Sequence, residues 1–550
     1  MNIGWGLTEV AASRPDAIAV VEPAGRDASG SRQYRSVTFQ ALEDDSTRIA
    51  SGLHEYGVRP GMRLALLVKP GIDFVSLVFA LFKAGVVTIL IDPGMGRENL
   101  VRCLAEARPE GFVAIPLAHV ARILKRRKFP RARFNVTVGR RWFWGGRTLA
   151  QIRRSTAAIE PLMSNAEDPA AIIFTTGSTG PPKGVLYRHG NFAHQVTQIR
   201  DRYDIQPGEV DLPGFPLFGL FNSAMGVTTV FPEMDFTRPA DVNPQFIHEH
   251  ATDWQPTQSF GSPALWNTVG KACERSDMRF PSIRRVLSAG APVPPHVLRR
   301  IKDVIAEDGE IHTPYGATEA LPVASISASE VLKETAEKSD QGAGTCVGRR
   351  FDGIDWRVIP ITDDPISTIE ETGTLERGEI GELIVRGPVV TTEYVTRTDA
   401  NAISKVRDGD GFWHRMGDCG YLDEQDRFWF CGRKTHRVET VSGTMFTVPC
   451  EAIANTHEQV YRSALVGIGS SADRLPVMIV EAWPEHRPGD VAAQTRLLDE
   501  VHALLQSNSL TSSIARRNVL LHEKFPVDIR HNAKIFREQL APWASDQLRE

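Results

Sequence analysis

The sequence predicts an α/β protein of at least two domains. The chain has 550 residues, more than one hydrophobic core usually supports. Hydrophobic residues make up 42% of the chain and charged residues 24%, which is typical of a globular protein. Short apolar strands alternate with helical stretches up to about residue 430. This alternation is typical of doubly wound sheets, which bind ligands beyond the carboxyl ends of their strands.

Four stretches show the alternation in chain order. Residues 63–71, RLALLVKPG, predict a strand followed by a turn. In residues 74–91 apolar side chains repeat at helical spacing up to Gly85, and an apolar strand then runs to Asp92. Residues 170–180, AAIIFTTGSTG, predict a strand and a glycine-rich loop, and residues 284–301 predict a strand, a turn and a helix. We therefore expect functional motifs at strand ends.

Charge and cysteine usage exclude several classes of protein. The net charge of -4 and the pI near 6.5 argue against a protein devoted to nucleic acid, which has a strongly basic domain. The six cysteines form no C-x-x-C pair, so neither a zinc ribbon nor a disulfide framework is indicated. No signal-peptide pattern is visible, and Lys83 and Gly85 interrupt the longest apolar stretch. We expect a cytoplasmic protein without a transmembrane segment.

Residues 122–147, RILKRRKFPRARFNVTVGRRWFWGGR, combine a basic run with Trp142, Phe143 and Trp144. Such a run is most often a solvated helix end and loop. Basic residues beside aromatic ones also suit an anionic membrane surface or a protein partner. Peripheral membrane contact is therefore the second interpretation of this segment, and the sequence leaves both open.

Residues 174–184, FTTGSTGPPKG, follow a predicted buried strand and predict a triphosphate-binding loop. Small residues free backbone amides to surround an anion, and hydroxyl groups add donors. The spacing is not that of a Walker A loop. The chain also lacks H-E-x-x-H and G-x-S-x-G, which argues against a zinc protease or a serine hydrolase. The candidate phosphate-binding residues are Thr175, Thr176, Gly177, Ser178, Thr179, Gly180 and Lys183.

Six motifs occur in order along the chain: FTTGSTGPPKG (174–184), SAGAPV (288–293), TPYGATE (313–319), GELIVRGP (381–388), HRMGDCGYLDEQDRFWFCGR (414–433) and AKIFR (533–537). Together they resemble the motifs of the adenylate-forming superfamily, which includes acyl-CoA ligases, luciferases and peptide-synthetase adenylation domains. The resemblance implies a large N-terminal AMP-binding domain, residues 1–432, and a small mobile α+β C-terminal domain, residues 433–550. It also implies ATP and Mg²⁺ as cofactors, and attack of a carboxylate on the α-phosphate of ATP to give an acyl-adenylate and pyrophosphate.

The same resemblance implies roles in nucleotide binding. The glycine-rich loop is expected at the β- and γ-phosphates, with Thr175 and Glu319 near Mg²⁺, a cation that prefers oxygen ligands. Asp418 is expected to bind the ribose hydroxyls from a turn that leads into a strand, and Arg433 to reach the ribose or a phosphate. The motif residues expected around the adenine are Gly290, Ala291, Pro292, Tyr315 and Gly316.

Two further matches imply catalytic roles. Thr318 is expected to contact the α-phosphate. Lys534 matches the lysine that bridges the carboxylate and the α-phosphate, where it would neutralise two anions that must approach each other. Nucleotidyl transfer is catalysed mainly by such positioning and by cations placed where charge develops.

The acid-binding pocket is predicted less specifically. Residues 211–226 and 260–266 are rich in aromatic and aliphatic side chains, which could wall an acyl tunnel or belong to the core. Members of the superfamily often have His after the sequence PLF, where this chain has Gly219. That change is expected to remove an aromatic gate and to leave space.

Residues 430–443, FCGRKTHRVETVSG, depart from the superfamily pattern. Typical members have an acidic residue and Ile-Lys after Gly-Arg, in a loop that lines the tunnel for a thiol acceptor. Together with residues 342–348 and 525–538, this stretch resembles the β-lactone synthetases of bacterial olefin biosynthesis. That branch implies adenylation of a long-chain 2-alkyl-3-hydroxy fatty acid, whose tethered hydroxyl then closes a β-lactone and releases AMP. Other enzymes of an olefin-biosynthesis assembly are candidate partners.

Several alternatives stay open. A long-chain fatty acid–CoA ligase would transfer the acyl group to CoA, and a non-catalytic nucleotide-binding scaffold would form no adenylate. For the lactone reaction, His436 or Glu439 is expected to accept the hydroxyl proton after rotation of the C-terminal domain. The alternative for both residues is an interdomain ion pair.

Overall fold

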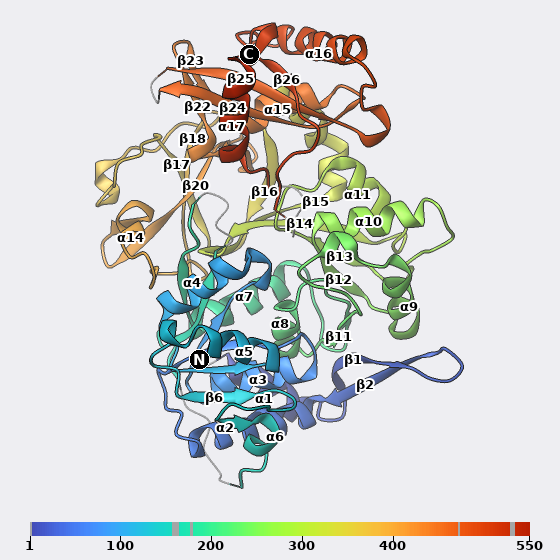
Figure 1. Ribbon diagram of the computed structural model, residues 1–550, viewed down its shortest axis with the longest axis vertical. Helices are drawn as coiled ribbons and strands as arrows, with labels where there is room; N and C mark the ends of the chain where they lie inside the picture. Colours follow the sequence, from blue (N-terminus) through green and yellow to red (C-terminus); the bar gives the residue numbers. More distant parts are fainter. Residues whose placement is uncertain (1–2, 157–163, 176–179, 471–472, 529–533, 550) are drawn as a thin grey trace.

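The computed structural model (Figure 1) describes residues 3–156, 164–175, 180–470, 473–528 and 534–549. It confirms the α/β class. Two large sheets occupy most of the chain, and a small three-stranded sheet follows near the C-terminus. In Figure 1 the N-terminal residues (blue) and the C-terminal residues (red) lie at opposite ends of the long axis.

The seven-stranded sheet has the order β7-β6-β5-β3-β4-β8-β9 and is parallel except for the β8–β9 pair. Strands β4 and β5 are buried along their whole length, as expected for parallel strands covered on both faces. The strands predicted near residues 63 and 170 are β3 and β8. The bounds are β3 Arg63–Leu67, β4 Val87–Leu90, β5 Gly111–Ala114, β6 Phe134–Thr137, β7 Arg147–Thr148, β8 Pro169–Phe174 and β9 Gly184–Arg188.

Helix α3, Ile72–Lys83, and strand β4 confirm the helix-then-strand interpretation of the longest apolar stretch. Lys83 is buried at the end of α3 and pairs with Glu43 at 2.7 Å. It also donates to the hydroxyls of Ser46 and Thr47 on α2, so its charge is compensated inside the core. Within the described ranges, no helix is both long and apolar enough to cross a membrane.

The larger sheet is parallel on one side and antiparallel on the other. Strands β1, β11, β10, β12, β13 and β14 are parallel neighbours, and the strands from β14 to β17 pair in antiparallel fashion. The bounds are β1 Ile18–Arg26, β2 Arg32–Thr38, β10 Val210–Asp211, β11 Thr228–Val230, β12 Gln258–Gly261, β13 Arg285–Ser288, β14 Glu310–Ala317, β15 Ala320–Ser327, β16 Thr345–Arg350, β17 Asp355–Ile359, β18 Gly381–Arg386, β19 Lys405–Asp408, β20 Gly411–Leu422 and β21 Phe428–Arg433.

Helices pack around both sheets (Figure 1). Helix α11 follows β13, as the stretch at residues 284–301 predicts. The bounds are α1 Gly4–Ser13, α2 Phe39–Glu55, α4 Arg97–Ala107, α5 Pro116–Leu124, α6 Leu149–Ile152, α7 His189–Arg202, α8 Phe218–Met225, α9 Pro244–Trp254, α10 Pro263–Cys273, α11 Pro295–Lys302, α12 Ala328–Glu330, α13 Ala336–Lys338 and α14 Ala400–Ser404.

The C-terminal part begins after β21, the last strand of the larger sheet. A hairpin and the three-stranded sheet β24-β25-β26 are covered by three helices and have hydrophobic clusters of their own. Helix α15 contacts β21 and so joins the two parts. The bounds are β22 Val438–Thr440, β23 Gly443–Met445, α15 Thr447–Asn455, β24 Val460–Ser470, β25 Asp473–Ala482, α16 Val491–Gln506, β26 Val519–Leu521 and α17 Arg537–Gln547.

All six cysteines are buried and free. Burial raises the pKa of the Cys103 thiol to about 11 and that of the Cys431 thiol to about 12. A buried neutral thiol is a poor nucleophile, so these side chains pack as small apolar groups.

Candidate active site

A cavity of about 3230 Å³ lies beyond the carboxyl ends of strands from both large sheets. Ordinary small-molecule pockets measure about 300–1,000 Å³, so this cavity has room for more than one ligand. The cavity lies at strand ends, where doubly wound sheets are expected to bind ligands.

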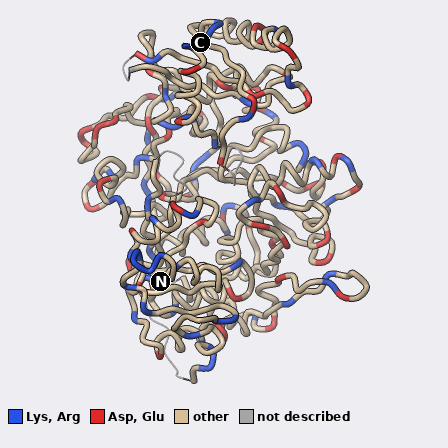
Figure 2. Tube along the Cα trace, in the orientation of Figure 1, with Lys and Arg blue, Asp and Glu red and all other residues tan. Residues whose placement is uncertain are grey.

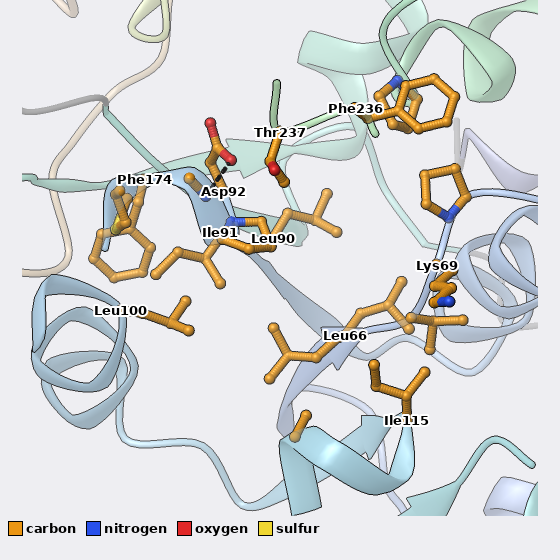
Figure 3. Close-up of a pocket in the computed structure, with 18 of the residues that line it drawn as sticks. Leu66, Lys69, Leu90, Ile91, Asp92, Leu100, Ile115, Phe174, Phe236 and Thr237 are labelled. Carbon is orange, nitrogen blue, oxygen red and sulfur yellow. Dashed lines mark hydrogen bonds between the residues drawn. The ribbon is translucent and has the colours of Figure 1, made fainter. Parts of the chain in front are cut away.

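The part of the cavity beside the seven-stranded sheet is lined mainly by apolar side chains, together with Lys69, Asp92 and Thr237 (Figure 3). It runs over the ends of β3 and β4 and between helices α4 and α5. At another part of its wall are Thr318 and Lys534, two of the four candidate catalytic residues. The apolar side chains labelled in Figure 3 are Leu66, Leu90, Ile91, Leu100, Ile115, Phe174 and Phe236.

The candidate phosphate loop connects β8 to β9. Thr175 and Lys183 close it: the Thr175 amide donates to the Lys183 carbonyl, and the Lys183 amide donates to the Thr175 hydroxyl, both at 3.0 Å. Gly180 is exposed with φ of 147°. Thr176, Gly177, Ser178 and Thr179 lie outside the described residues. The loop returns directly into a strand, which distinguishes it from a Walker A loop, where a helix follows.

A cluster of polar side chains surrounds Glu319, between β14 and β15. The Tyr394 hydroxyl donates to Glu319 Oε1 at 2.6 Å, and Lys183 Nζ lies 4.8 Å from the centre of the Tyr394 ring. Burial lowers the pKa of Lys183, although Glu319 opposes that shift. Burial likewise lowers the pKa of Lys405 to about 7. No sequence motif marks Tyr394 or Lys405, because the two residues approach Glu319 only in the folded chain.

The residues around Glu319 fit a Mg²⁺ ion held mainly by a nucleotide. In the described part of the chain, no group of three or more His, Cys, Asp or Glu side chains could form a protein cage for a metal ion. Mg²⁺ commonly takes one or two carboxylates and completes its shell with phosphates and water. The Glu319 carboxylate, a hard oxygen ligand, meets that requirement.

Asp418 bonds to two other predicted nucleotide-binding residues, Arg433 and Tyr315. Its Oδ1 accepts from Arg433 Nη1 at 2.7 Å, and its Oδ2 accepts from the Tyr315 hydroxyl. Asp418 raises the pKa of Arg433, and burial followed by Asp418 raises that of Tyr315. A carboxylate offers about four acceptor positions, so two remain for ligand hydroxyls. Asp418 lies within the continuous strand β20 and pairs with Arg433 of β21, so the expected turn at this residue was wrong.

The other motif residues lie on neighbouring strand ends. Thr318 is in the tight connection between β14 and β15, where its carbonyl accepts from the Tyr187 hydroxyl at 2.6 Å. Gly316 is sterically required, because a Cβ there would lie 2.6 Å from the Ala320 carbonyl oxygen. The predicted adenine-flanking residues of the loop between β13 and α11 are Gly290, Ala291 and Pro292.

Lys534 approaches the cavity from the C-terminal part of the chain. Its carbonyl accepts from the Asp528 amide at 3.0 Å, and Val527 and Ile535 form an antiparallel bridge beside it. Val527, Asp528 and Phe536 line the same cavity. This arrangement brings Lys534 to the cavity that Thr318 lines, although the two residues belong to different parts of the chain.

His436 and Glu439 lie away from that cavity in this arrangement of the two parts. His436 lines a second cavity of about 580 Å³ with Gly180 and Arg537. Burial, then Arg537 and Arg433, lower its pKa to about 3, below the near-neutral value expected of a base. Glu439 pairs with Arg437 at 2.9 Å, a residue of the same C-terminal part, so this pair is not the interdomain ion pair stated as its alternative. Arg437 itself pairs with Asp363, from the segment after β17, at 2.5 Å.

The two stretches considered for the acyl wall divide between the two alternatives, cavity wall and core. Phe215 and Leu217 line the cavity, whereas Trp266, from the second stretch, is a buried core residue. The expectation that Gly219 leaves space was wrong. A Cβ at this position would lie 2.9 Å from the Phe231 ring, so that ring already fills the volume next to α8.

Known proteins resemble this chain over its whole length. A family model described as AMP-binding enzyme matches residues 7–395. An olefin beta-lactone synthetase of Xanthomonas campestris is 45% identical, covering 99% of this chain and 98% of that protein, and one of Stenotrophomonas maltophilia is 44% identical, covering 100% and 98%. The crystal structure of ATP-bound MatB from Rhodopseudomonas palustris matches with a TM-score of 0.77 at 20% identity, covering 99% of both chains, and so supports the fold.

Proposed function

Because the chain belongs to the AMP-binding enzyme family and is close to olefin beta-lactone synthetases over its full length, we propose that it converts a long-chain 2-alkyl-3-hydroxy fatty acid into a β-lactone. The enzyme is an adenylate-forming ligase that uses ATP. In the proposed reaction the acid carboxylate attacks the α-phosphate of ATP and releases pyrophosphate. The 3-hydroxyl then attacks the activated carbonyl, which releases AMP and closes the ring.

One observation carries the proposal: a single cavity joins Thr318 and Lys534 to a long apolar wall. The polar residues suit the carboxylate and the α-phosphate. The apolar wall suits alkyl chains, whose burial contributes about 0.8 kcal/mol per CH₂ group. The acid would therefore lie with its reacting carboxylate near Lys534 and its chains against β3, β4 and α4.

In the first half-reaction, we assign the residues the roles of positioning the reactants and neutralising their charge. Lys534 would place a cation between the carboxylate and the α-phosphate, whose mutual repulsion opposes the attack. Thr318 would donate to the α-phosphate. Asp418, already oriented by Tyr315 and Arg433, would accept the ribose hydroxyls.

Lys183 and Glu319 would act at the pyrophosphate end. Lys183, with Thr175 at the start of the glycine-rich loop, would contact the β- and γ-phosphates. Glu319 would hold Mg²⁺, and Thr175 is its second candidate ligand. When bound, this ion neutralises charge on the leaving pyrophosphate.

The second half-reaction needs no external acceptor. The hydroxyl and the activated carbonyl belong to one molecule, so their effective concentration is high. Exclusion of water from around the acyl-adenylate would limit competing hydrolysis. For the hydroxyl proton we retain His436 or Glu439 as candidate acceptors, which would have to reach the cavity through rotation of the C-terminal part.

The test is product formation from purified protein, ATP and Mg²⁺ with and without CoA. We expect a 3-hydroxy acid to give AMP and β-lactone without CoA. The matched acid that lacks the 3-hydroxyl should support pyrophosphate exchange but give no lactone. If CoA is required and the 3-deoxy acid becomes a thioester, the protein is an acyl-CoA ligase instead. Without acid-dependent pyrophosphate exchange, the protein would be a nucleotide-binding scaffold.

A further inference from the structure

Helix α5 presents an apolar face to solvent. Leu117, Ala121 and Leu124 recur at spacings of four and three residues, which places them on one face of the helix. All three are exposed, with Leu117 at 71% and Leu124 at 77%. All three also line the large cavity, so this face forms part of the rim where the apolar cavity reaches the surface.

A second exposed apolar group lies next to α5. Trp142 and Phe143 are 54% and 76% exposed. Both contact Trp144, which packs against His119 of α5 and donates to the Thr137 hydroxyl at 2.9 Å. The buried Trp144 therefore anchors this loop to the helix. Four of the ten large hydrophobic side chains exposed in the described ranges belong to α5 and this loop.

The same segment is strongly basic. Residues 117–143 contain nine Lys and Arg residues and no Asp or Glu. Figure 2 shows a concentrated run of Lys and Arg near the N mark, in the segment that follows α5. Eight of the nine basic residues are exposed: Lys125, Arg126, Arg127, Lys128, Arg131, Arg133, Arg140 and Arg141.

We propose that α5, residues 125–133 and residues 139–144 form a docking surface for an anionic lipid bilayer, and that the cavity rim on α5 is the opening through which the acid passes from the bilayer. Exposed apolar side chains bordered by basic residues suit the boundary between headgroups and acyl chains. Each basic residue near an anionic leaflet adds about 1 kcal/mol of attraction. The passage of the acid, but not the docking, rests on the proposed function.

The geometry explains why docking and uptake would occur at one place. The side chains that would enter the lipid, Leu117 and Leu124, also line the cavity that would receive the alkyl chains. An acid moving along α5 would therefore keep its chains in apolar surroundings. Direct passage avoids the cost of exposing a long alkyl chain to water.

Flotation of the full-length protein with vesicles tests the docking. We expect binding to vesicles of phosphatidylcholine mixed with phosphatidylglycerol, weak binding to phosphatidylcholine alone, and loss of binding in concentrated salt. Combining Arg126→Glu, Arg127→Glu and Arg131→Glu should lower the affinity about tenfold or more. None of these three residues lines the cavity. The matched control combines Arg275→Glu, Arg487→Glu and Arg517→Glu, three exposed residues elsewhere.

A second variant tests how much the exposed apolar side chains contribute to vesicle binding, apart from the basic residues. Combining Trp142→Ser with Phe143→Ser should lower vesicle affinity while leaving the melting temperature unchanged, because both side chains are exposed. The docking proposal is overturned if the wild-type protein does not bind anionic vesicles. It is also overturned if the control triple variant loses as much binding as the Arg126/Arg127/Arg131 variant. A protein partner would then be the occupant to seek.

Activity measurements separate this proposal from the proposed function. With a long-chain acid supplied in anionic vesicles, the Arg126/Arg127/Arg131 variant should form AMP at least several-fold more slowly than wild type. With a short, water-soluble 3-hydroxy acid the two proteins should be equal. Equal rates with the vesicle-borne acid would overturn the uptake route. Vesicle binding without any acid-dependent AMP formation would instead refute the proposed function and leave the docking intact.

Discussion

Lys534 belongs to the C-terminal part of the chain but lines the same cavity as Thr318, which lies between two strands of the larger sheet. Its position in the cavity wall with Thr318 depends on the short bridged segment around Val527 and Ile535. A lysine near a C-terminus is ordinarily solvated, and periodicity gives no reason to select this one. Its role was predicted only by the resemblance of AKIFR to a known motif.

We expect Lys534→Ala to lower the rate of acid-dependent pyrophosphate exchange by about 10²–10³, the usual effect of removing one donor that stabilises developing charge. ATP binding should change much less, because the other phosphate and ribose contacts remain. Lys524→Ala is the matched control, since Lys524 is exposed in the same segment. An unchanged exchange rate in the Lys534 variant would exclude its assigned role.

His436 should affect the second half-reaction alone. His436→Ala is expected to retain pyrophosphate exchange and to slow lactone formation by about 10², the lower end of general-base effects. Glu439→Gln is the comparison, because Glu439 is held by Arg437. Single-turnover lactone release measures the step. Lactone formed by His436→Ala at the wild-type rate would remove His436 from the chemistry.

At the scale of elements, β10 contains a buried carboxyl group, that of Asp211. Asp211 is 1% exposed and accepts from Asn222 of α8 at 2.6 Å. Burial raises its pKa from 3.8 to about 7. Between these values the folded protein keeps a proton that the unfolded chain releases, so stability should fall as the pH rises from about 4 to 7.

Asp211→Asn should remove that pH dependence, which corresponds to at most about 4 kcal/mol over the window. The melting temperature of the variant relative to wild type is therefore expected to rise from pH 5 to pH 7 and to level off above the folded pKa. Asp201→Asn, at an exposed position on α7, serves as the control. Parallel melting curves for wild type and Asp211→Asn at all pH values would contradict the raised pKa.

The elements also show how far the sequence could predict the fold. Strands β3 and β4 and helix α3 were predictable because continuous burial leaves an apolar pattern in the sequence. The antiparallel half of the larger sheet was not, because pairs such as β16 with β21 join distant segments. The prediction that Gly219 leaves space was wrong for the same reason, because the Phe231 ring that fills this space belongs to the segment after β11 and reaches Gly219 only in the fold.

Part of the candidate site could likewise be predicted from the sequence, and part could not. Motif order located the phosphate loop, Glu319, Asp418 and Lys534. Tyr394 lies 75 residues from Glu319 in the sequence and bonds to it only in the folded chain. Lys405 is likewise an ordinary lysine until burial lowers its pKa. Only the fold reveals these two residues.

At the scale of the whole molecule, a buried ion cluster fastens the segment between the two parts. Glu382 is 1% exposed and accepts from Arg415 at 2.6 Å and from Lys434 at 3.1 Å. Lys434 is the first residue after β21. The Glu382 carboxylate is therefore one of the contacts that hold the start of the C-terminal part to the larger sheet, beside the bond from Lys434 to the Thr362 carbonyl at 2.8 Å.

Glu382→Gln leaves two buried cations without their counter-charge, so we expect a loss of about 3–5 kcal/mol in stability. The thermal unfolding transition of the protein should move to lower temperature, and proteolysis near residues 434–437 should become faster. The control is Glu376→Gln, because Glu376 is exposed and precedes β18, the strand that contains Glu382. It should leave the thermal transition and the rate of proteolysis unchanged. A normal transition in Glu382→Gln would mean that the cations find other partners.

The burial of all six cysteines has a practical consequence for following the catalytic cycle. Because the native thiols are shielded and their pKa values are raised where burial dominates, a thiol-reactive dye should ignore them under native conditions. One cysteine introduced on the surface of each part would then carry a donor and acceptor pair without removal of any native residue. Förster transfer between the dyes could time the movement of the C-terminal part against pyrophosphate release and ring closure.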